Sequence, residues 1–308
     1  MAKESQGLVG LLKESINGFI DNDCPTMAAA LSYYTVFSLP PLLVLLLLVL
    51  GAVLDPQDIQ GNIESQISGL MGPAGAEQVR TILANADRPG SGGAVATVLS
   101  VLALLLGATG VFGQLQAALN KAWEVAPDPN QGGLKGFLVK RVFSLGMVLG
   151  LAFVLLVSLV LSAFLSSFGD SLGRFLPDGL SAPVIEGINF AVSFGVITLL
   201  FAAIYKIVPD ARMAWRDVWV GAAATALLFV LGKFALGLYL GRSNPGEAFG
   251  AAGALALMLV WIYYSSMIVL LGAEFTEAWA EGRGSGIAPE KGAVRVKHET
   301  HHERPAEA

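Results

Sequence analysis

The stretch that most constrains the fold runs from Ala28 to Leu54 and carries no charged side chain. A hydrocarbon core about 30 Å thick needs about 20 apolar residues in a helix, and this stretch is longer. Two adjacent prolines, Pro40 and Pro41, lie near its middle. Proline inside a helix removes a backbone hydrogen bond, and in lipid the freed groups need protein or a water-filled cavity. We therefore predict a spanning helix that is bent or broken near the midplane and packed against neighbours.

The composition of the whole chain is that of a membrane protein. Of its 308 residues 54% are hydrophobic and 14% are charged, whereas soluble domains carry about 25% charged residues. The net charge of −5 argues against a nucleic-acid-binding protein, which usually has a basic surface. The single cysteine, Cys24, excludes an internal disulfide framework. The N-terminal residues lack the apolar block and cleavage site of a signal peptide.

Hydropathy predicts an all-α fold, a polytopic membrane helical bundle with six transmembrane helices. The predicted spans cover about residues 28–54, 94–119, 142–166, 184–207, 218–240 and 249–272, within one transmembrane domain over residues 25–282. Segment 55–93 has apolar residues at helical spacing on both sides of Gly72 and Pro73, which predicts short amphipathic helices at the extracytoplasmic face.

The two ends of the chain differ from this domain. Residues 1–24 have apolar residues at a spacing of three and four, which predicts an amphipathic helix lying in the membrane interface. A helix packed on the cytoplasmic mouth of the bundle fits this pattern as well. Residues 283–308 are polar and rich in charge, glycine and proline, which predicts a disordered cytoplasmic tail.

Basic residues predict that both termini are cytoplasmic. With that orientation, only Arg80, Arg88, Arg174 and Arg242 lie outside, and all other basic residues of the loops and ends lie inside. Tryptophans agree with this orientation, because they favour membrane interfaces. Those near the predicted cytoplasmic helix ends are Trp123, Trp215, Trp219 and Trp279.

Candidate site residues lie near the middle of the predicted membrane. Tyr263 and Tyr264 fall near the centre of the sixth span, although tyrosine normally favours the interface. Buried hydroxyl groups need hydrogen-bond partners, and the backbone freed by the two prolines supplies acceptors at a similar depth. We therefore predict a cavity lined by Ser38, Pro40, Pro41, Tyr263 and Tyr264. A packed, hydrogen-bonded core is the alternative.

Lys233 is the one basic residue inside a predicted span. It follows the start of its span by fifteen residues, or about 22 Å at 1.5 Å per residue. An ionisable group at this depth indicates function, although a long lysine side chain can also extend to the interface. If the lysine is functional, it predicts a hydrophobic or amphipathic substrate with an anionic head.

Polar residues also gather at the predicted cytoplasmic helix ends. Asn120 closes the second span, Arg216 and Asp217 open the fifth, and Glu274 closes the sixth. These residues suggest a polar cluster, although helix capping explains Asp217 equally well. The histidines, at positions 298, 301 and 302, lie in the tail without the fixed geometry of a metal site, so no metal is predicted. No nucleotide-binding glycine loop occurs, so no cofactor is predicted.

Four stretches together resemble the YihY/virulence-factor BrkB family of membrane proteins. They are AAALSYYTVFSLPPLL (28–43), LQAALNKAWEV (115–125), VPDARMAWRDVWVGAAATALLFVLGKFALGLYL (208–240) and FGAAGALALMLVWIYYSSMIVLLGAEFT (249–276). The resemblance covers roughly residues 8–283 and implies a six-helix protein of the bacterial inner membrane. It implies the following motif residues, without roles: Tyr33, Tyr34, Pro40, Pro41, Asn120, Pro209, Asp210, Lys233, Gly250, Tyr263, Tyr264 and Glu274.

The resemblance bears on function through what members of the family have been linked to. Some members have been called ribonuclease BN, but this sequence has no clustered carboxylates or histidines to hold the metal ions of such an enzyme. Others are linked to resistance to host killing and to export or envelope-lipid phenotypes. We expect a transporter, or a translocator of lipids or amphiphiles, that contacts membrane lipids and is not an enzyme. The alternative is a structural or scaffolding protein of the cell envelope, and the sequence leaves a homo-oligomer open.

Overall fold

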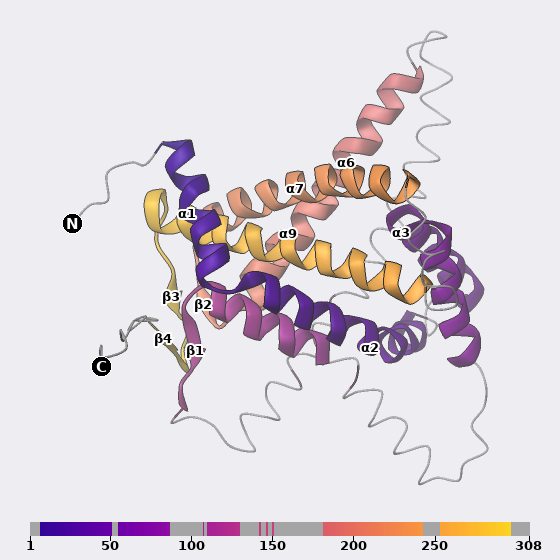
Figure 1. Ribbon diagram of the computed structural model, residues 1–308, viewed down its shortest axis with the longest axis horizontal. Coiled ribbons are helices and arrows are strands. Elements are labelled where there is room, and N and C mark those ends of the chain that lie inside the picture. The colour runs from indigo at the N-terminus through magenta and orange to yellow at the C-terminus, as the bar shows by residue number, and fades with distance from the viewer. Residues whose placement is uncertain are drawn as a thin grey trace, which may run out of the picture.

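The computed structural model describes residues 7–50, 55–86, 107, 110–129, 142, 146, 150, 181–242 and 253–296. The helices are α1 (Leu8–Asp21), α2 (Cys24–Leu50), α3 (Pro56–Ala86), α6 (Ser181–Ile207), α7 (Trp215–Arg242) and α9 (Gly253–Arg283), with another over residues 110–122. The strands are β1 (Val125–Pro127), β2 (Ala211–Arg212), β3 (Ala288–Pro289) and β4 (Ala293–Arg295). Figure 1 shows α1 and all four strands at one end of the helical bundle and α3 at the other. We call the end with α1 and the strands the strand end.

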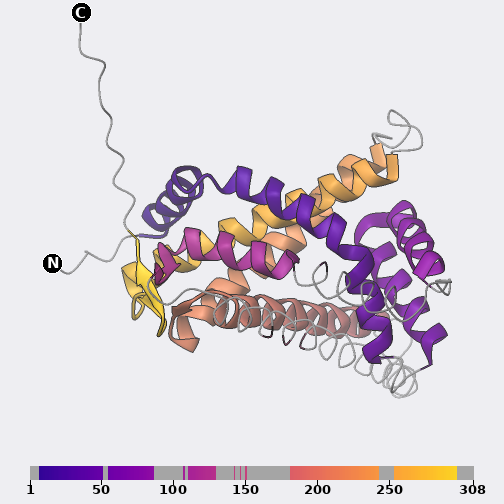
Figure 2. The ribbon, with the colours of Figure 1, turned by 90° about the horizontal axis from the view of Figure 1, so that it is seen from below.

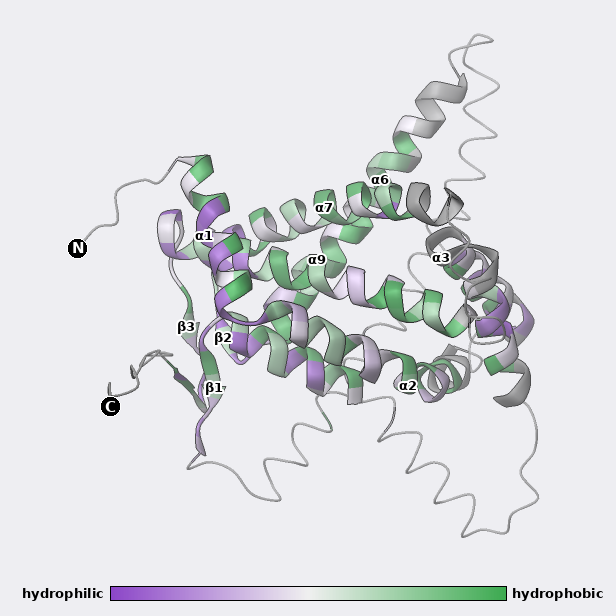
Figure 3. Cartoon of the chain, in the orientation of Figure 1, coloured by the Kyte–Doolittle hydropathy of each residue, from purple (hydrophilic) through white to green (hydrophobic). Residues whose placement is uncertain are grey.

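Four helices contain apolar segments long enough to cross a membrane. These segments are Cys24–Val44 in α2, Phe190–Ile207 in α6, Trp215–Leu236 in α7 and Leu255–Arg283 in α9. They match the first, fourth, fifth and sixth predicted spans, whereas predicted spans 94–119 and 142–166 lie mostly outside the described residues. Figure 3 shows hydrophobic residues through the middle of the bundle and hydrophilic residues near the strands and on α3. The protein is therefore a mostly helical membrane protein.

The proline pair bends α2 without ending it. The helix contains Pro40 and Pro41 and continues to Leu50, and Figure 2 shows its axis changing direction along its length. A bent helix is therefore correct and a broken one is wrong. Contacts with other helices support the segment before the bend and at the bend itself. Ser32 Oγ donates to the carbonyl oxygen of Leu259 in α9 at 2.8 Å, and a Cβ at Gly107 would lie 2.8 Å from Cγ of Pro41.

Helix α3 folds back on itself. Arg80 Nη2 lies 2.7 Å from Glu64 Oε2, although the two residues are 16 positions apart. In a straight helix that separation is about 24 Å, so the chain reverses between them. Val79 and Leu83 are buried with Leu43 of α2 in one hydrophobic cluster. The reversal lies in the segment for which two short amphipathic helices were predicted, and the place of that segment at the extracytoplasmic face stays a prediction.

Helices α7 and α9 approach each other through a reciprocal pair of contacts. Gly221 of α7 lies against the side chain of Thr276, and Gly272 of α9 lies against that of Thr225. Each threonine donates to the carbonyl oxygen of the glycine four residues earlier in its own helix, at 2.8 Å in α7 and 2.6 Å in α9. Small residues let helix backbones approach closely in a membrane. The same Gly-x-x-x-Thr pattern in both helices therefore lets them pack closely at one crossing.

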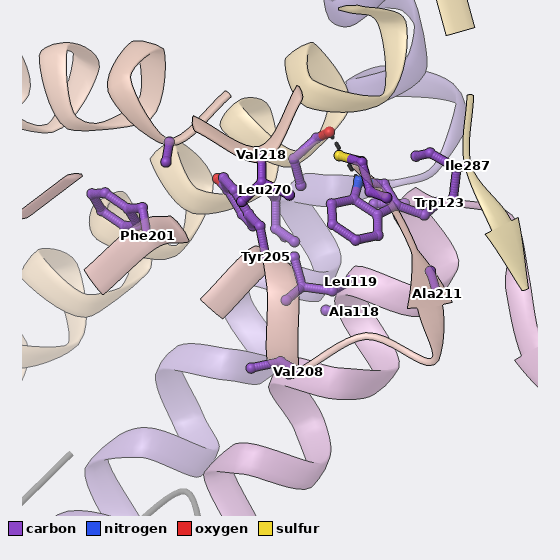
Figure 4. Close-up of a cluster of buried hydrophobic side chains, with 14 of the residues drawn as sticks. Ala118, Leu119, Trp123, Phe201, Tyr205, Val208, Ala211, Val218, Leu270 and Ile287 are labelled. Carbon is purple, nitrogen blue, oxygen red and sulfur yellow. Dashed lines mark hydrogen bonds between the residues drawn. The ribbon is translucent and has the colours of Figure 1, made fainter. Parts of the chain in front are cut away.

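Two large aromatic side chains fill the core beside this crossing, as Figure 4 shows. Tyr205 of α6 donates to the carbonyl oxygen of Val269 at 2.7 Å and also pairs with Thr225 Oγ1 at 3.0 Å. Trp123, with its ring centroid 6.0 Å from that of Tyr205, is fully buried and donates to the carbonyl oxygen of Ala273 at 3.0 Å. The expected place of Trp123 in an interfacial belt is therefore wrong, because its indole N–H has a partner inside the bundle.

Part of the predicted tail forms β-structure at the strand end. β4 pairs antiparallel with β1, with Val125 opposite Arg295, and β3 pairs antiparallel with β2, with Ala211 opposite Pro289. Arg295 Nη2 also lies 2.8 Å from Glu281 Oε1 of α9. Polar composition predicts disorder from residue 283, but pairing with distant strands orders the chain up to residue 296. Residues 297–308, with the three histidines, lie outside the described part.

Candidate functional site

Glu274 is a buried carboxylate at the strand end of α9. Its side chain is 2% exposed, and its Oε1 atom accepts a hydrogen bond from Asn22 Nδ2 at 2.8 Å and one from Cys24 Sγ at 3.4 Å. Oε2 faces Gly18 of α1, where a Cβ atom would clash with it. Within the described residues, no lysine or arginine forms an ion pair with this carboxylate. Glu274 thereby fixes α1 and the start of α2 against α9.

Asn120 holds the connection between α6 and α7. Its Nδ2 donates to Asp210 Oδ2 at 2.8 Å, and its Oδ1 accepts from the backbone N–H of Asp210 at 2.8 Å. Gln116, one turn earlier in the same helix, donates to Asp210 Oδ1 at 3.2 Å. The amide and carboxylate groups therefore satisfy each other, and this network attaches helix 110–122 to the residues before β2.

Asp217 connects the first turn of α7 to the chain that follows α9. The carboxylate is 2% exposed, and its Oδ2 accepts from the backbone N–H of Ser285 at 3.0 Å and from Ser285 Oγ at 2.9 Å. Gly284 packs against the same carboxylate, with its Cβ position 2.5 Å from Asp217 Cγ. Neither bond caps a helix N-terminus, so Asp217 acts between elements rather than within α7.

The predicted polar residues at this end therefore belong to three separate networks. Glu274 bonds to α1 and α2, Asn120 to the α6–α7 connection, and Asp217 to the chain after α9. Arg216 is exposed. The arrangement is that of tertiary attachments at the end of a bundle. Among the described residues, no three His, Cys, Asp or Glu side chains form a group suited to a metal ion.

Four of the five residues predicted to line a cavity face different neighbours. A Cβ at Gly110 would lie 3.3 Å from Ser38 Oγ, so Ser38 faces the helix over 110–122. Tyr264 of α9 faces α7, with its hydroxyl 2.5 Å from the Cβ position of Gly232. Tyr263 packs against the main hydrophobic core instead. Pro41 lies against Gly107, as described above. These are contacts between closely packed helices.

Lys233 is exposed on α7, immediately after the glycine that Tyr264 contacts. Leu231 and Phe234, two residues before it and one after it, are exposed by 58% and 69% and lie about 160° and 100° around the helix from Lys233. Lys233 has no hydrogen bond or ion pair with any residue that the structure describes. A cationic head thus lies on an apolar outer surface, within a segment able to span a membrane.

Sequence reasoning missed several residues that organise these regions. Asn22 and Gln116 are ordinary surface residue types, and nothing in the local sequence points to partners far along the chain. The crossing of α7 and α9 did have a signal: GAAAT at 221–225 and GAEFT at 272–276 share glycine and threonine four residues apart. Among the motif residues, Tyr33 and Tyr34 are exposed on α2, and Gly250 lies outside the described residues.

Known proteins match most of this chain. The family described as virulence factor BrkB matches residues 15–295. A UPF0761 membrane protein of Alkalilimnicola ehrlichii is 30% identical over 282 residues, which cover 89% of this chain and 60% of the relative. One from a Psychrobacter species is 28% identical over 268 residues, covering 86% of this chain and 47% of the relative.

A UPF0761 membrane protein of Chromohalobacter salexigens is 30% identical over 273 residues, covering 87% of this chain and 62% of the relative. The chain thus spans about half to three fifths of the length of these relatives. No solved structure matches the chain. The family match reaches from the second half of α1 to β4 and so includes all the other helices and strands described above. The chain therefore belongs to the BrkB virulence factor family of membrane proteins.

Proposed function

We propose that this protein translocates amphiphiles with an anionic head across the bacterial inner membrane, along the exposed face of α7. The observation that carries the proposal is Lys233, an exposed cation without a described partner in a span-length apolar helix. A charged side chain in the hydrocarbon region is costly and usually marks a substrate or ion pathway. An anionic headgroup would supply the charge partner that Lys233 lacks.

The surroundings of Lys233 suit the rest of such a substrate. Phe234, the next residue along α7, is exposed by 69% and lies about 100° around the helix from Lys233, and Leu227 and Leu231 continue this apolar face with exposures of 53% and 58%. Acyl chains against this face would leave the headgroup within reach of the long lysine side chain. Tyr264 contacts the preceding residue, Gly232, which links this surface to the centre of α9. Ser38 and Pro41 face another helix, so we assign them to the bend of α2 rather than to the pathway.

The basic residues support an orientation with the strand end in the cytoplasm. Lys206, Arg212, Arg216 and Arg283 all lie at the strand-end termini of α6, α7 and α9 or beside them. α1 and β4 lie at this same end (Figure 1). An excess of lysine and arginine favours the cytoplasmic side. Both chain ends are then cytoplasmic, and Lys233 lies in the outer half of the membrane.

A leaflet-exchange assay tests the proposal. The full chain is reconstituted in vesicles that contain fluorescent phosphatidylglycerol or fluorescent phosphatidylcholine, and dithionite reports the label in the outer leaflet. We expect exchange above protein-free vesicles, faster for the anionic lipid. A charge-assisted hydrogen bond contributes about 1.5–3 kcal/mol, so Lys233→Gln should slow anionic exchange by about tenfold or more.

Lys13→Gln is the matched control, because it removes another exposed cation, on α1, and should leave the rate unchanged. Wild-type protein that moves neither lipid would overturn the proposal. Equal rates for wild type and Lys233→Gln would remove Lys233 from the pathway. Absence of transport together with specific capture of cytoplasmic proteins by the strand end would favour the scaffolding alternative.

A further inference from the structure

Helix α1 has three distinct faces. Leu11 and Ser15 are buried, at 1% and 2% exposure, and Gly18 lies against Glu274. A second face is apolar and exposed; it consists of Leu8, Val9, Leu12, Ile16 and Ile20, exposed by 48% to 80%. A third face is polar and exposed; it consists of Lys13, Asn17 and Asp21. At about 100° per residue, the apolar face covers about 120° of the helix surface, between the buried and the polar face.

The protein's own core covers only the first of these faces. An amphipathic helix of a soluble protein has one apolar face, which it buries against the core. Here the apolar side chains next to the buried face remain exposed, and three of them exceed 60%. Five neighbouring apolar side chains exposed on a single helix mark a surface that a partner covers.

The position of α1 identifies that partner. α1 ends at Asp21, and α2 begins at Cys24 with a segment able to span a membrane. Figure 1 and Figure 2 both show α1 lying across the long axis of the bundle, at the strand end. At the same end, Trp215 and Trp219 of α7 are exposed by 54% and 44%, as expected of tryptophans at a membrane interface. A helix that runs across the spanning helices, at the depth of these tryptophans, lies in the plane of the membrane interface.

We infer that the apolar face of α1 inserts into the interface of the bilayer at the strand end and binds lipid through acyl chains rather than headgroup charge. Lys13 contributes one positive charge, and Glu14 and Asp21 contribute one negative charge each, so α1 has a net charge of −1. Helices that bind anionic lipid electrostatically are rich in lysine and arginine on the polar face. Insertion by α1 therefore depends on apolar contact and on lipid packing.

The same geometry connects the membrane surface to the core. The buried face of α1 is fixed to α9 through Gly18, and Asn22 bonds to Glu274 at 2.8 Å. Lipid that pulls on the apolar face therefore acts on α9 through this contact. This role of α1 does not depend on what the protein transports.

Fluorescence quenching tests the inference in the full-length protein. A single cysteine at Ile16 or, as the matched control, at Asn17 carries an NBD label, in a Cys24→Ala background. The protein is reconstituted in phosphatidylcholine vesicles whose lipids are brominated near the carbonyl end of the acyl chains. We expect quenching several-fold stronger at position 16 than at position 17, unchanged by salt and by added phosphatidylglycerol.

Equal quenching at the two positions would overturn the inference, as would quenching at position 16 that requires anionic lipid. Energy transfer between differently labelled copies at position 16, without lipid quenching, would instead place a second copy of the chain on this face. Cys24 is fully buried, so if Cys24→Ala does not fold, the same labels are introduced with Cys24 retained. Hydrogen exchange of the α1 amides, measured in the unlabelled full-length protein, gives an independent test. We expect slower exchange in nanodiscs than in detergent.

Discussion

The strand end and the crossing of α7 and α9 are held together by different chemistry. At the strand end, Glu274, Asn120 and Asp217 each form side-chain hydrogen bonds to another element. At the crossing, Gly221 and Gly272 lie directly against threonine side chains of the facing helix. Each threonine hydroxyl there donates within its own helix.

The two kinds of contact lie at the same level of α9, because Glu274 falls between Gly272 and Thr276, and the difference follows from what each face of the helix meets. Lipid tails are as apolar as leucine, so helices in the membrane associate through close packing of small residues rather than through a hydrophobic driving force. At the end of the bundle, polar groups are available for bonds between elements, but burial makes each unsatisfied group costly. The crossing should therefore be sensitive to volume, and the strand end to the loss of individual polar groups.

The largest effect is expected from added volume at the crossing. Gly221→Leu places a large side chain where Thr276 already lies, and overpacking of a filled core costs about 1–3 kcal/mol or more. We expect loss of folded protein or a marked fall in Tm, measured in detergent. Gly195→Leu on α6 is the control, because nothing lies within 4 Å of its Cβ position. A similar Tm for the two variants would show that the crossing tolerates volume.

A smaller effect is expected from the loss of one polar partner at the strand end. Asn22→Ala leaves the buried carboxylate of Glu274 with only the weak Cys24 thiol as donor, and an unsatisfied buried group costs about 1–3 kcal/mol. Hydrogen exchange should show faster exchange of α1, whereas Asn17→Ala, on the exposed face of the same helix, should not. Unchanged protection of α1 in Asn22→Ala would mean that this bond does not hold the helix.

The smallest of these effects is expected at Asp217. Ser285 is exposed, so in Asp217→Ala water replaces the lost acceptor, and the net cost is about 1 kcal/mol. The chain after α9 should then be cut faster by trypsin at Arg283 and Lys291 than in wild type. Arg216→Ala changes the adjacent exposed residue and should leave the cleavage rate unchanged. Equal rates for both variants would show that Asp217 does not hold this segment.

Sequence reasoning predicted those parts of the fold that depend on local hydropathy. Four predicted spans coincide with span-length helices, and the reversal of α3 lies in the segment for which two short helices were predicted. Local patterns do not specify contacts between distant residues. The partner of Asn22 lies 252 residues away, and the strands of the tail are ordered by pairing with segments before α6 and α7.

The candidate site was predicted less completely, for a physical reason. Depth in the membrane follows from residue count along a helix, but the direction of a side chain depends on which neighbour its face meets. Ser38 and Tyr264 lie on facing helices, α2 and α9, yet they face two further partners, the helix over 110–122 and α7. Lys233 was identified correctly as an unusual residue in a span, and only the structure places it on the outer surface.

The most direct test of the proposed function compares two substitutions at one position. Lys233→Arg keeps the positive charge on the exposed face of α7, and Lys233→Gln removes it. In the leaflet-exchange assay with fluorescent phosphatidylglycerol, the account predicts near wild-type rates for Lys233→Arg and rates lower by about tenfold or more for Lys233→Gln, since the lost charge-assisted bond is worth about 1.5–3 kcal/mol. Equal rates for the two variants would contradict the proposal that Lys233 binds an anionic headgroup.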